Sequence, residues 1–223
     1  MKLQKTMLGC LVIAAIGGTN FASAAPITVT GWAYPNGQSV NIQSTVPNKT
    51  INGVGAGGFA TTDGTSNFVS WCVDILQYTY FGNPANDYTL VNAASVFDAA
   101  RANALGQLAT QYLGSVTNTT TSAAFQLAVW EIVYETGSNP FTLASGNFKA
   151  SNNTNAINQA NTWLGSLSGT STYSTNVLQS GTRQDLLTFT TVPEPSMLAL
   201  FGIGLAGLGF AKRKQAKKQQ DAV

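Results

Sequence analysis

Alternating apolar and polar side chains predict three strands in the first third of the chain. Residues 27–33 (ITVTGWA) and 39–46 (SVNIQSTV) alternate as half-buried strands do, and the turn-like Pro-Asn-Gly of residues 35–37 lies between them. We therefore expect these two strands to form a hairpin. Residues 68–76 (FVSWCVDIL) predict a third strand, whereas the glycine-rich residues 53–58 predict a loop or a bulge.

From residue 92 onward the apolar positions follow a helical period. Residues 92–113, 123–135 and 154–167 repeat apolar side chains three and four positions apart, as amphipathic helices do. The buried stripe expected in the first of these helices comprises Val96, Ala99, Ala100, Leu105, Leu108, Ala109, Tyr112 and Leu113. Residues 184–190 then predict a closing strand. This order indicates a single α+β domain, with a β-rich N-terminal part, a helical middle portion and a closing strand.

The helix predicted over residues 123–135 (AAFQLAVWEIVYE) carries an amide on its apolar side. At 100° per residue, three apolar neighbours lie within about 60° of Gln126 around the helix axis, while Glu131 and Glu135 lie about 140° and 180° from it. These neighbours are Val129, Trp130 and Val133. A buried amide costs about 1–3 kcal/mol unless it is hydrogen-bonded, so Gln126 requires a partner. The two glutamates are expected in solvent, and Thr121 or Ser122 is expected to cap the helix.

The candidate partner is Cys72, which lies 54 positions earlier and is the only cysteine after residue 24. On a regular strand, Cys72 and Asp74 share one face with Ser70, and Trp71 points to the other. We expect the helix that carries Gln126 to cover the Cys72 face. Taken singly, Cys72 also fits a small buried hydrophobe, and Gln126 and Trp130 fit ordinary core residues.

The two stretches WCVD and FQLAVW together resemble the signature of the thioester domains of bacterial surface adhesins. The resemblance implies that the Cys72 sulfur and the Gln126 side-chain carbonyl condense, with loss of ammonia, to an internal thioester. It also implies a fold that combines β-structure with a helical portion and holds the bond between them. Asp74 and Trp130 are possible assisting residues. The Asp74 carboxylate would act either as a general base or merely as a negative charge that raises the thiol pKa.

Several other mechanisms lack the residues that they need. The chain has no histidine, which excludes Cys-His and Ser-His pairs and histidine-bound metals. The scattered acidic residues have no calcium-loop spacing, and no cofactor is expected. We expect covalent adhesion to amines on a partner, without enzymatic turnover. Two alternatives remain: a non-covalent, structural or polysaccharide-binding component of the extracellular matrix or biofilm, and an extracellular hydrolase with an unidentified carboxylate pair.

Residues 1–24 read as a secretory signal peptide. They combine Lys2 and Lys5, an apolar run over residues 7–16, and the A-x-A cleavage pattern of residues 22–24. The exported domain is then expected over residues 25–191. It holds four basic and seven acidic residues, a net charge of −3, which argues against nucleic acid as a partner.

The C-terminal end carries three features in order. Pro193, Glu194 and Pro195 precede fifteen uncharged residues, 197–211, and then a basic cluster. That cluster comprises Lys212, Arg213, Lys214, Lys217 and Lys218. Residues 197–211 predict one short transmembrane helix of about 22 Å, extended by snorkelling lysines.

This order resembles the PEP-CTERM sorting signal of Gram-negative, exopolysaccharide-producing bacteria, placed at residues 192–218 with a tail at 219–223. The resemblance implies an exosortase as processing partner and export through the inner membrane. It also implies transient anchoring by the C-terminal helix and a final place at the cell surface or in the extracellular matrix, with exopolysaccharide as a possible partner. A plain C-terminal membrane anchor is the alternative.

Overall fold

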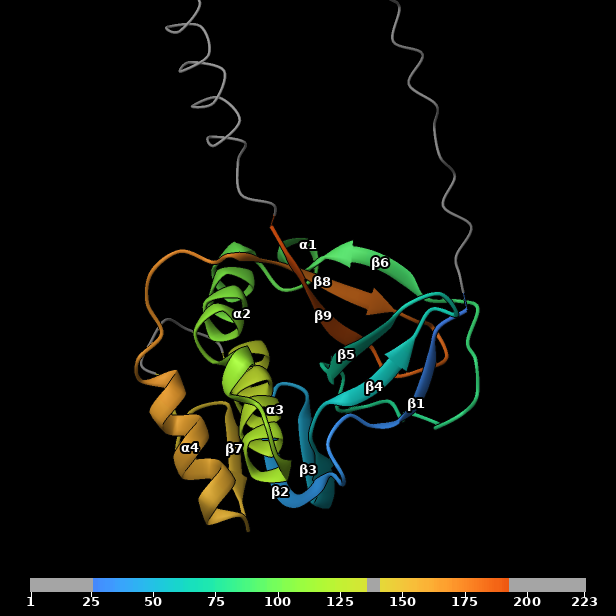
Figure 1. Ribbon diagram of the computed structural model, residues 1–223. Coiled ribbons are helices and arrows are strands. Elements are labelled where there is room, and N and C mark those ends of the chain that lie inside the picture. Colours follow the sequence, from blue (N-terminus) through green and yellow to red (C-terminus); the bar gives the residue numbers. More distant parts are fainter. Residues whose placement is uncertain (1–25, 136–140, 193–223) are drawn as a thin grey trace, which may run out of the picture.

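The computed structural model describes residues 26–135 and 141–192, and its larger sheet has six antiparallel strands in the order β1-β4-β5-β9-β8-β6 (Figure 1). These strands are β1 (Thr28–Trp32), β4 (Phe59–Thr62), β5 (Asn67–Cys72), β6 (Thr89–Asn92), β8 (Tyr173–Gln179) and β9 (Leu186–Thr191). The sheet joins the first and last parts of the domain, because β5 pairs with β9 between Cys72 and Leu186.

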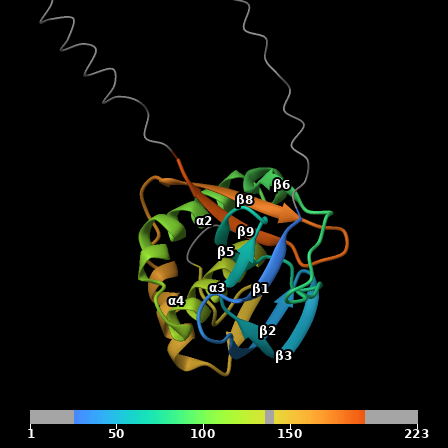
Figure 2. The same ribbon diagram turned by 45° about the vertical axis from the view of Figure 1, so that its right-hand side comes forward.

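A second sheet has three strands, in the order β3-β2-β7. They are β2 (Gln38–Thr45), β3 (Asn48–Ala56) and β7 (Phe148–Ser151). β2 and β3 form a hairpin at the rim of the molecule (Figure 2). The glycine-rich residues 53–58 belong partly to β3. A bulge interrupts the register of the hairpin near Gly53, which has a φ of 71°, and the strand then continues to Ala56.

The hairpin predicted between residues 27–33 and 39–46 is wrong. Both segments are strands, but β1 pairs with β4 and β2 pairs with β3 and β7, so the two lie in different sheets. The side-chain alternation of β1 and β2 reports which face each strand buries, and it carries no information about the neighbouring strand.

The helices occupy the middle of the chain and lie beside the sheets (Figure 1). They are α1 (Ala93–Val96), α2 (Ala99–Tyr112), the 3-10 turn η1 (Leu113–Ser115), α3 (Thr119–Tyr134) and α4 (Thr154–Leu164). The single helix predicted over residues 92–113 breaks at Asp98, whose φ of 141° does not continue a helix and whose side chain caps α2. Ala99 and Ala100 are consequently exposed, contrary to the predicted stripe.

Helix α3 is the centre of the domain. It contacts strands of both sheets as well as α2 and α4, and every residue from Ser122 to Val133 is buried. Its N-cap is Asn118, three residues before the predicted cap; Thr121 completes a capping box as the third helical residue. The confirmed architecture is a mixed α+β domain, rich in β-structure and with its helices in the middle.

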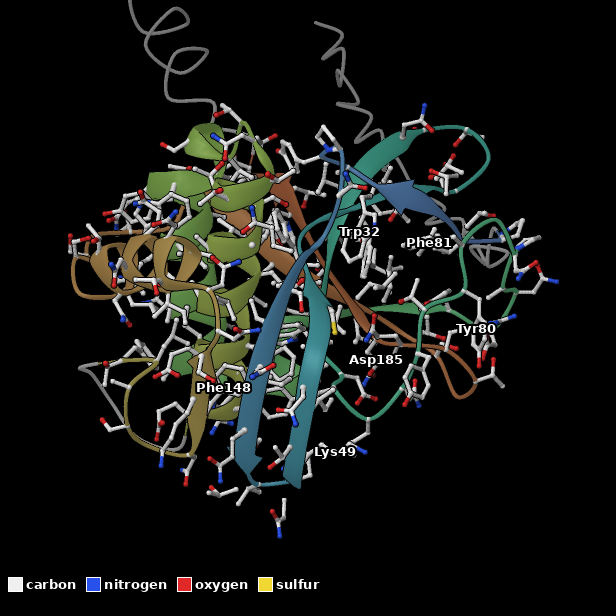
Figure 3. All side chains as sticks on the ribbon, turned by 90° about the horizontal axis from the view of Figure 1, so that it is seen from below. Trp32, Lys49, Tyr80, Phe81, Phe148 and Asp185 are labelled. Carbon is white, nitrogen blue, oxygen red and sulfur yellow. The ribbon has the colours of Figure 1, made fainter. Side chains whose placement is uncertain are left out.

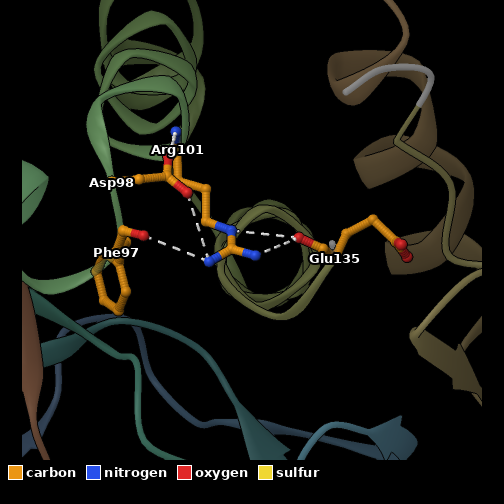
Figure 4. A network of polar contacts seen from close by, with 4 residues as sticks. All are labelled: Phe97, Asp98, Arg101 and Glu135. Atoms are coloured by element: carbon orange, nitrogen blue, oxygen red, sulfur yellow. Dashed lines mark hydrogen bonds and ion pairs between the residues drawn. The ribbon is translucent and has the colours of Figure 1, made fainter. Parts of the chain in front are cut away.

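Arg101 ties α2 to the C-terminal end of α3 (Figure 4). Its Nε and Nη2 both donate to the Glu135 carbonyl, at 3.2 and 3.0 Å, and its Nη1 lies 3.6 Å from Asp98 Oδ2. Because the last carbonyls of a helix lack intrahelical donors, a guanidinium at this place stabilises the end of α3.

Several predicted segments lie outside the described residues. They are the signal peptide at 1–24, the helix end at residues 136–137, Pro193, Glu194 and Pro195, the transmembrane helix at 197–211 and the tail at 219–223. Within residues 26–135 and 141–192, no helix combines the length and hydropathy that crossing a bilayer requires.

Candidate functional site

The side chain of Gln126 forms two hydrogen bonds to the backbone of Cys72. Its Oε1 accepts from the Cys72 N–H at 2.9 Å, and its Nε2 donates to the Cys72 carbonyl at 2.8 Å. Gln126 and Cys72 are only 1% and 2% exposed, so both bonds form away from water. The amide predicted to need a buried partner therefore has one, and that partner is the residue expected from the sequence.

The Cys72 sulfur lies between a donor and an acceptor. Trp130 Nε1 donates to Sγ at 3.4 Å, and Sγ donates to the Asp74 carbonyl at the same distance. Burial raises the pKa of the Cys72 thiol to about 12, although the Trp130 hydrogen bond acts in the opposite direction. At neutral pH the sulfur therefore keeps its proton.

The termination of β5 brings both Trp71 and Cys72 against α3. The predicted strand over residues 68–76 ends at Cys72, and the Trp71 ring packs on Phe125 with centroids 4.4 Å apart. Alternation was expected to turn Trp71 away from the helix, and this expectation is wrong because Phe125 and Gln126 present adjacent positions of α3 to the strand end. The expectation that this helix covers Cys72 is confirmed.

Two side chains from distant elements hold the segment that follows Cys72. The Tyr134 hydroxyl donates to the Val73 carbonyl at 2.7 Å and accepts from the Ile75 N–H at 3.0 Å. Gln184 Nε2 donates to the carbonyl of Asp74 at 3.0 Å and to that of Gln77 at 3.1 Å. The Asp74 carbonyl, which accepts from the Cys72 sulfur, is therefore also held by the Gln184 side chain.

Asp74 approaches the sulfur with its backbone and not with its carboxylate. Its Oδ1 accepts from the Leu76 N–H at 2.7 Å, which closes a tight turn after the cysteine. The negative charge of Asp74 contributes to the raised pKa of Cys72. The geometry accordingly suits the charge effect considered for Asp74 better than proton transfer by its carboxylate.

A half-open pocket of about 210 Å³ reaches Cys72 from the surface. It is lined by Trp32, Ile51, Val54, Gly55, Phe59, Cys72, Ile75, Gln77, Tyr78, Thr79, Phe81, Trp130 and Gln184. Trp32 packs against Phe59 and Phe81 with ring centroids 5.0 and 5.6 Å apart, and Figure 3 shows Trp32 and Phe81 together on one side of the hairpin. The sulfur is therefore shielded from bulk water but lies on a path to the outside.

Few features of the sequence indicate which residues line this pocket. Trp32 lies 40 positions before Cys72, and Gln184 lies 112 positions after it. One signal was the glycine content of β3, since a Cβ on Gly55 would lie 3.0 Å from the Trp32 ring. Gln184 had no local signal, because its nearness to Asp74 follows from the pairing of β5 with β9.

Glu131 and Glu135 do not form the solvated face that was predicted. Glu131 is fully buried; its Oε1 accepts from the Thr142 N–H at 2.8 Å, and its Oε2 has no partner among the described residues. Burial raises the pKa of the Glu131 carboxyl to about 8. Glu135 is half-buried and accepts from the Asn147 N–H at 2.8 Å. The prediction is wrong because residues 141–148 cover this side of the helix.

No metal site is evident in the described part of the chain. Across residues 26–135 and 141–192, histidine, cysteine, aspartate and glutamate side chains form no group of three that could hold a metal ion.

Comparison with known proteins identifies the C-terminal signal. Residues 191–214 match the PEP-CTERM protein-sorting motif, which implies export, transient membrane anchoring and processing by an exosortase. No curated protein matches the chain.

Two solved structures of surface proteins are similar to this one. The first is the N-terminal thioester domain of a surface protein from Clostridium perfringens, solved as a cysteine-to-alanine mutant: identity is 12%, coverage is 69% of this chain and 99% of that chain, and the TM-score is 0.44. The second is the N-terminal domain of the Streptococcus pyogenes pilus tip adhesin Cpa, with 13% identity, 72% and 100% coverage and a TM-score of 0.44.

Proposed function

We propose that the exported domain forms an internal thioester between Cys72 and Gln126 and uses it for covalent adhesion to amines on a partner molecule. The observation that carries this proposal is the double hydrogen bond between the Gln126 amide and the Cys72 backbone, in a buried site with the sulfur alongside. Fixing the two reactants in one place replaces a bimolecular encounter, which can lower the barrier to thiol attack on the amide by about 7–11 kcal/mol.

The condensation joins Sγ to the side-chain carbonyl carbon of Gln126 and breaks that carbon's bond to Nε2. The thiol proton leaves with the nitrogen, so that one ammonia is released. The Cys72 N–H, 2.9 Å from Oε1, is positioned to stabilise the negative charge that develops on this oxygen. Trp130 donates to the sulfur and stabilises its anionic character, which gives this side chain an assisting role.

The thioester then serves as an activated acyl group. A primary amine attacks the former Gln126 carbonyl, the bond to sulfur breaks, and the Cys72 thiol is restored as a stable amide forms. The aromatic pocket limits water at the bond and leaves one route for the amine. Each domain reacts once, so the protein acts as an adhesin without enzymatic turnover, at the cell surface or in the extracellular matrix after exosortase processing.

Intact mass tests the proposal. The exported protein, purified without reductant or amine buffer, is expected to be lighter than its sequence by one ammonia, and Cys72→Ala should abolish this deficit. Methylamine should add to the wild type at residue 126 and leave Cys72→Ala unmodified. A wild type of full mass, with an alkylatable thiol and an unchanged glutamine at residue 126, would contradict the thioester; a glutamate there would mean a bond already hydrolysed.

A non-covalent matrix component is the second candidate. Three aromatic side chains beside the pocket favour it, because Tyr78, Tyr80 and Phe81 are 75%, 51% and 45% exposed. Exposed apolar side chains that lie close together mark interaction surfaces and ligand-binding grooves. The methylamine experiment separates the two candidates, since an intact amide and a free thiol do not form the adduct.

A further inference from the structure

The outer edge of β3 runs beside the pocket that leads to Cys72. β3 is nine residues long, and among the described strands it pairs with β2 alone. Ile51, Val54 and Gly55 of this strand line the pocket together with Ile75 and Gln77, which follow Cys72. A molecule lying along this edge would therefore pass the mouth of the pocket.

The edge offers backbone groups to a partner. In an antiparallel strand the N–H and C=O groups of alternate residues point away from the neighbouring strand, so the edge of β3 presents a row of donors and acceptors. The Gly53 N–H already has a partner, because it donates to Asn41 Oδ1 at 2.9 Å. An extended polypeptide repeats the same spacing of donors and acceptors and can add to such an edge as a strand.

The charge around the sulfur favours a cation. Asp74 and Asp185 both act on the Cys72 thiol through their negative charge, and Val73 donates to the Asp185 carbonyl at 3.0 Å. The residues that line the pocket include no lysine or arginine. Figure 3 shows Asp185 on the same side of the hairpin as the aromatic residues, whereas Lys49 lies at its tip. A protonated amine is thus drawn toward the pocket from solution.

The pocket is large enough for a side chain. Its volume is about 210 Å³, well above the space that a single water needs. The aromatic walls suit the aliphatic stem of a lysine, which can bury its methylenes while its amine reaches a polar group at the far end. Cys72 and Trp130 are the most deeply buried of the lining residues, each 2% exposed.

We propose that the outer edge of β3 binds an extended segment of the partner protein as an added strand, and that a lysine of this segment enters the pocket and supplies the reacting amine. The lysine ammonium first releases one proton to solvent. Its nitrogen then bonds to the carbonyl carbon of residue 126, the carbon–sulfur bond breaks, and the sulfur takes the second proton that the nitrogen loses. This inference rests on the proposed function for its covalent step. The docking step does not depend on it.

Hydrogen exchange tests the docking step alone. The probe is an end-blocked hexapeptide, TVTKVT, added to the full-length Cys72→Ala variant, with Cys72→Ser as a second variant should alanine disturb folding. Amides of residues 48–54 should exchange at least fivefold more slowly with saturating peptide, while those of β7, at the opposite edge of the same sheet, should be unaffected. No protection of β3, or equal protection of β7, would overturn the proposal. Protection of β3 by maltohexaose would also overturn it. Protection that grows with protein concentration in the absence of peptide would overturn it as well, because a second copy of the chain would then be the occupant.

Reaction rates test the coupling of docking to chemistry. With wild-type protein, the hexapeptide should form adducts at least tenfold faster than methylamine at equal concentration. The same peptide with N-methyl groups on alternate backbone amides should lose this advantage, because it cannot pair with an edge strand. Equal rates for all three amines would overturn the strand proposal while leaving the thioester intact. Absence of a methylamine adduct together with an unchanged glutamine at residue 126 would instead contradict the proposed function, and the exchange experiment would still decide the docking.

Discussion

The Tyr134 hydroxyl, at the end of α3, holds the backbone immediately after Cys72. It donates to the Val73 carbonyl at 2.7 Å and accepts from the Ile75 N–H at 3.0 Å, so that one side chain satisfies two backbone groups. The same helix thus binds Cys72 itself through Gln126 and the following turn through Tyr134. This arrangement fixes the sulfur relative to the amide from two points, 8 residues apart on one helix.

Replacing Tyr134 with phenylalanine should therefore weaken both the fold and the site. Two backbone groups lose their partner, and an unsatisfied buried group costs about 1–3 kcal/mol, so we expect the free energy of unfolding to fall by about that amount. Urea denaturation measures the loss. Tyr112→Phe is the matched control, since the Tyr112 hydroxyl bonds only to the Ser166 hydroxyl at the surface. An equal loss in both variants would contradict the role given to Tyr134.

The indole N–H of Trp130 should speed thioester formation. Trp130→Phe keeps an aromatic ring but removes the donor to Sγ, a bond worth about 0.5–1.5 kcal/mol, so formation should slow about two- to tenfold. The rate of ammonia loss in freshly refolded protein, followed by intact mass, measures the effect. Trp71→Phe provides the control, because the Trp71 Nε1 is buried without a hydrogen-bond partner among the described residues. Equal slowing in the two variants would assign the effect to packing.

The buried carboxyl of Glu131 should make stability depend on pH. Its folded pKa of about 8 lies above the ordinary value of 4.5, so between these values the folded protein holds a proton that the unfolded chain has lost. The stabilisation of the protonated form is complete below about pH 4.5 and is lost as the pH rises through about 8. We expect the free energy of unfolding to fall by a few kcal/mol across this range.

Denaturation of the wild type and Glu131→Gln at a series of pH values checks this expectation. The glutamine variant should show a shallower slope, because it has no carboxyl to titrate at this position. The pKa of Asp185 is also raised by burial, and its contribution of the same sign remains in both curves. Identical slopes would mean that Glu131 is charged in the folded protein throughout this range.

The capping box at the start of α3 should contribute to the free energy of unfolding of the whole domain. Asn118 accepts from the Thr121 N–H at 3.0 Å, and Asn118→Ala removes this bond from the helix that all other layers contact. The free energy of unfolding should fall by about 0.5–2 kcal/mol. Thermal unfolding of Asn118→Ala beside Asn118→Asp, which keeps the capping oxygen, measures the cap itself. A similar loss in both variants would exclude a capping effect.

The proposed reactive pair could be inferred from local patterns together with the resemblance of WCVD and FQLAVW to the thioester-domain signature. The helical period placed Gln126 on an apolar face, and the cost of a buried amide demanded a partner; both inferences need only neighbouring residues. Cys72 was identified because it is the only cysteine in residues 25–191 and because of the residues around it. Strand and helix types were mostly right for the same reason, because periodicity reports the direction of successive side chains.

The limits of that reasoning are visible at Glu131. The periodic pattern treats a helix as having one apolar and one solvated side, but α3 is covered on all sides, and residues 141–148 bury the glutamate. Burial there depends on a segment that begins ten positions after Glu131. No property of the helix sequence encodes that cover.

The sequence by itself determined the residues on which the proposed chemistry depends, because the thiol, the amide and the directions of their side chains are local properties. Only the tertiary structure decided how the site is enclosed and approached. Trp32, Phe59 and Phe81 meet above Cys72 because β1 pairs with β4 instead of β2, and Gln184 reaches Asp74 because β9 pairs with β5. Strand pairing depends on the free energy of the whole packed domain, and alternation within a single strand does not specify it.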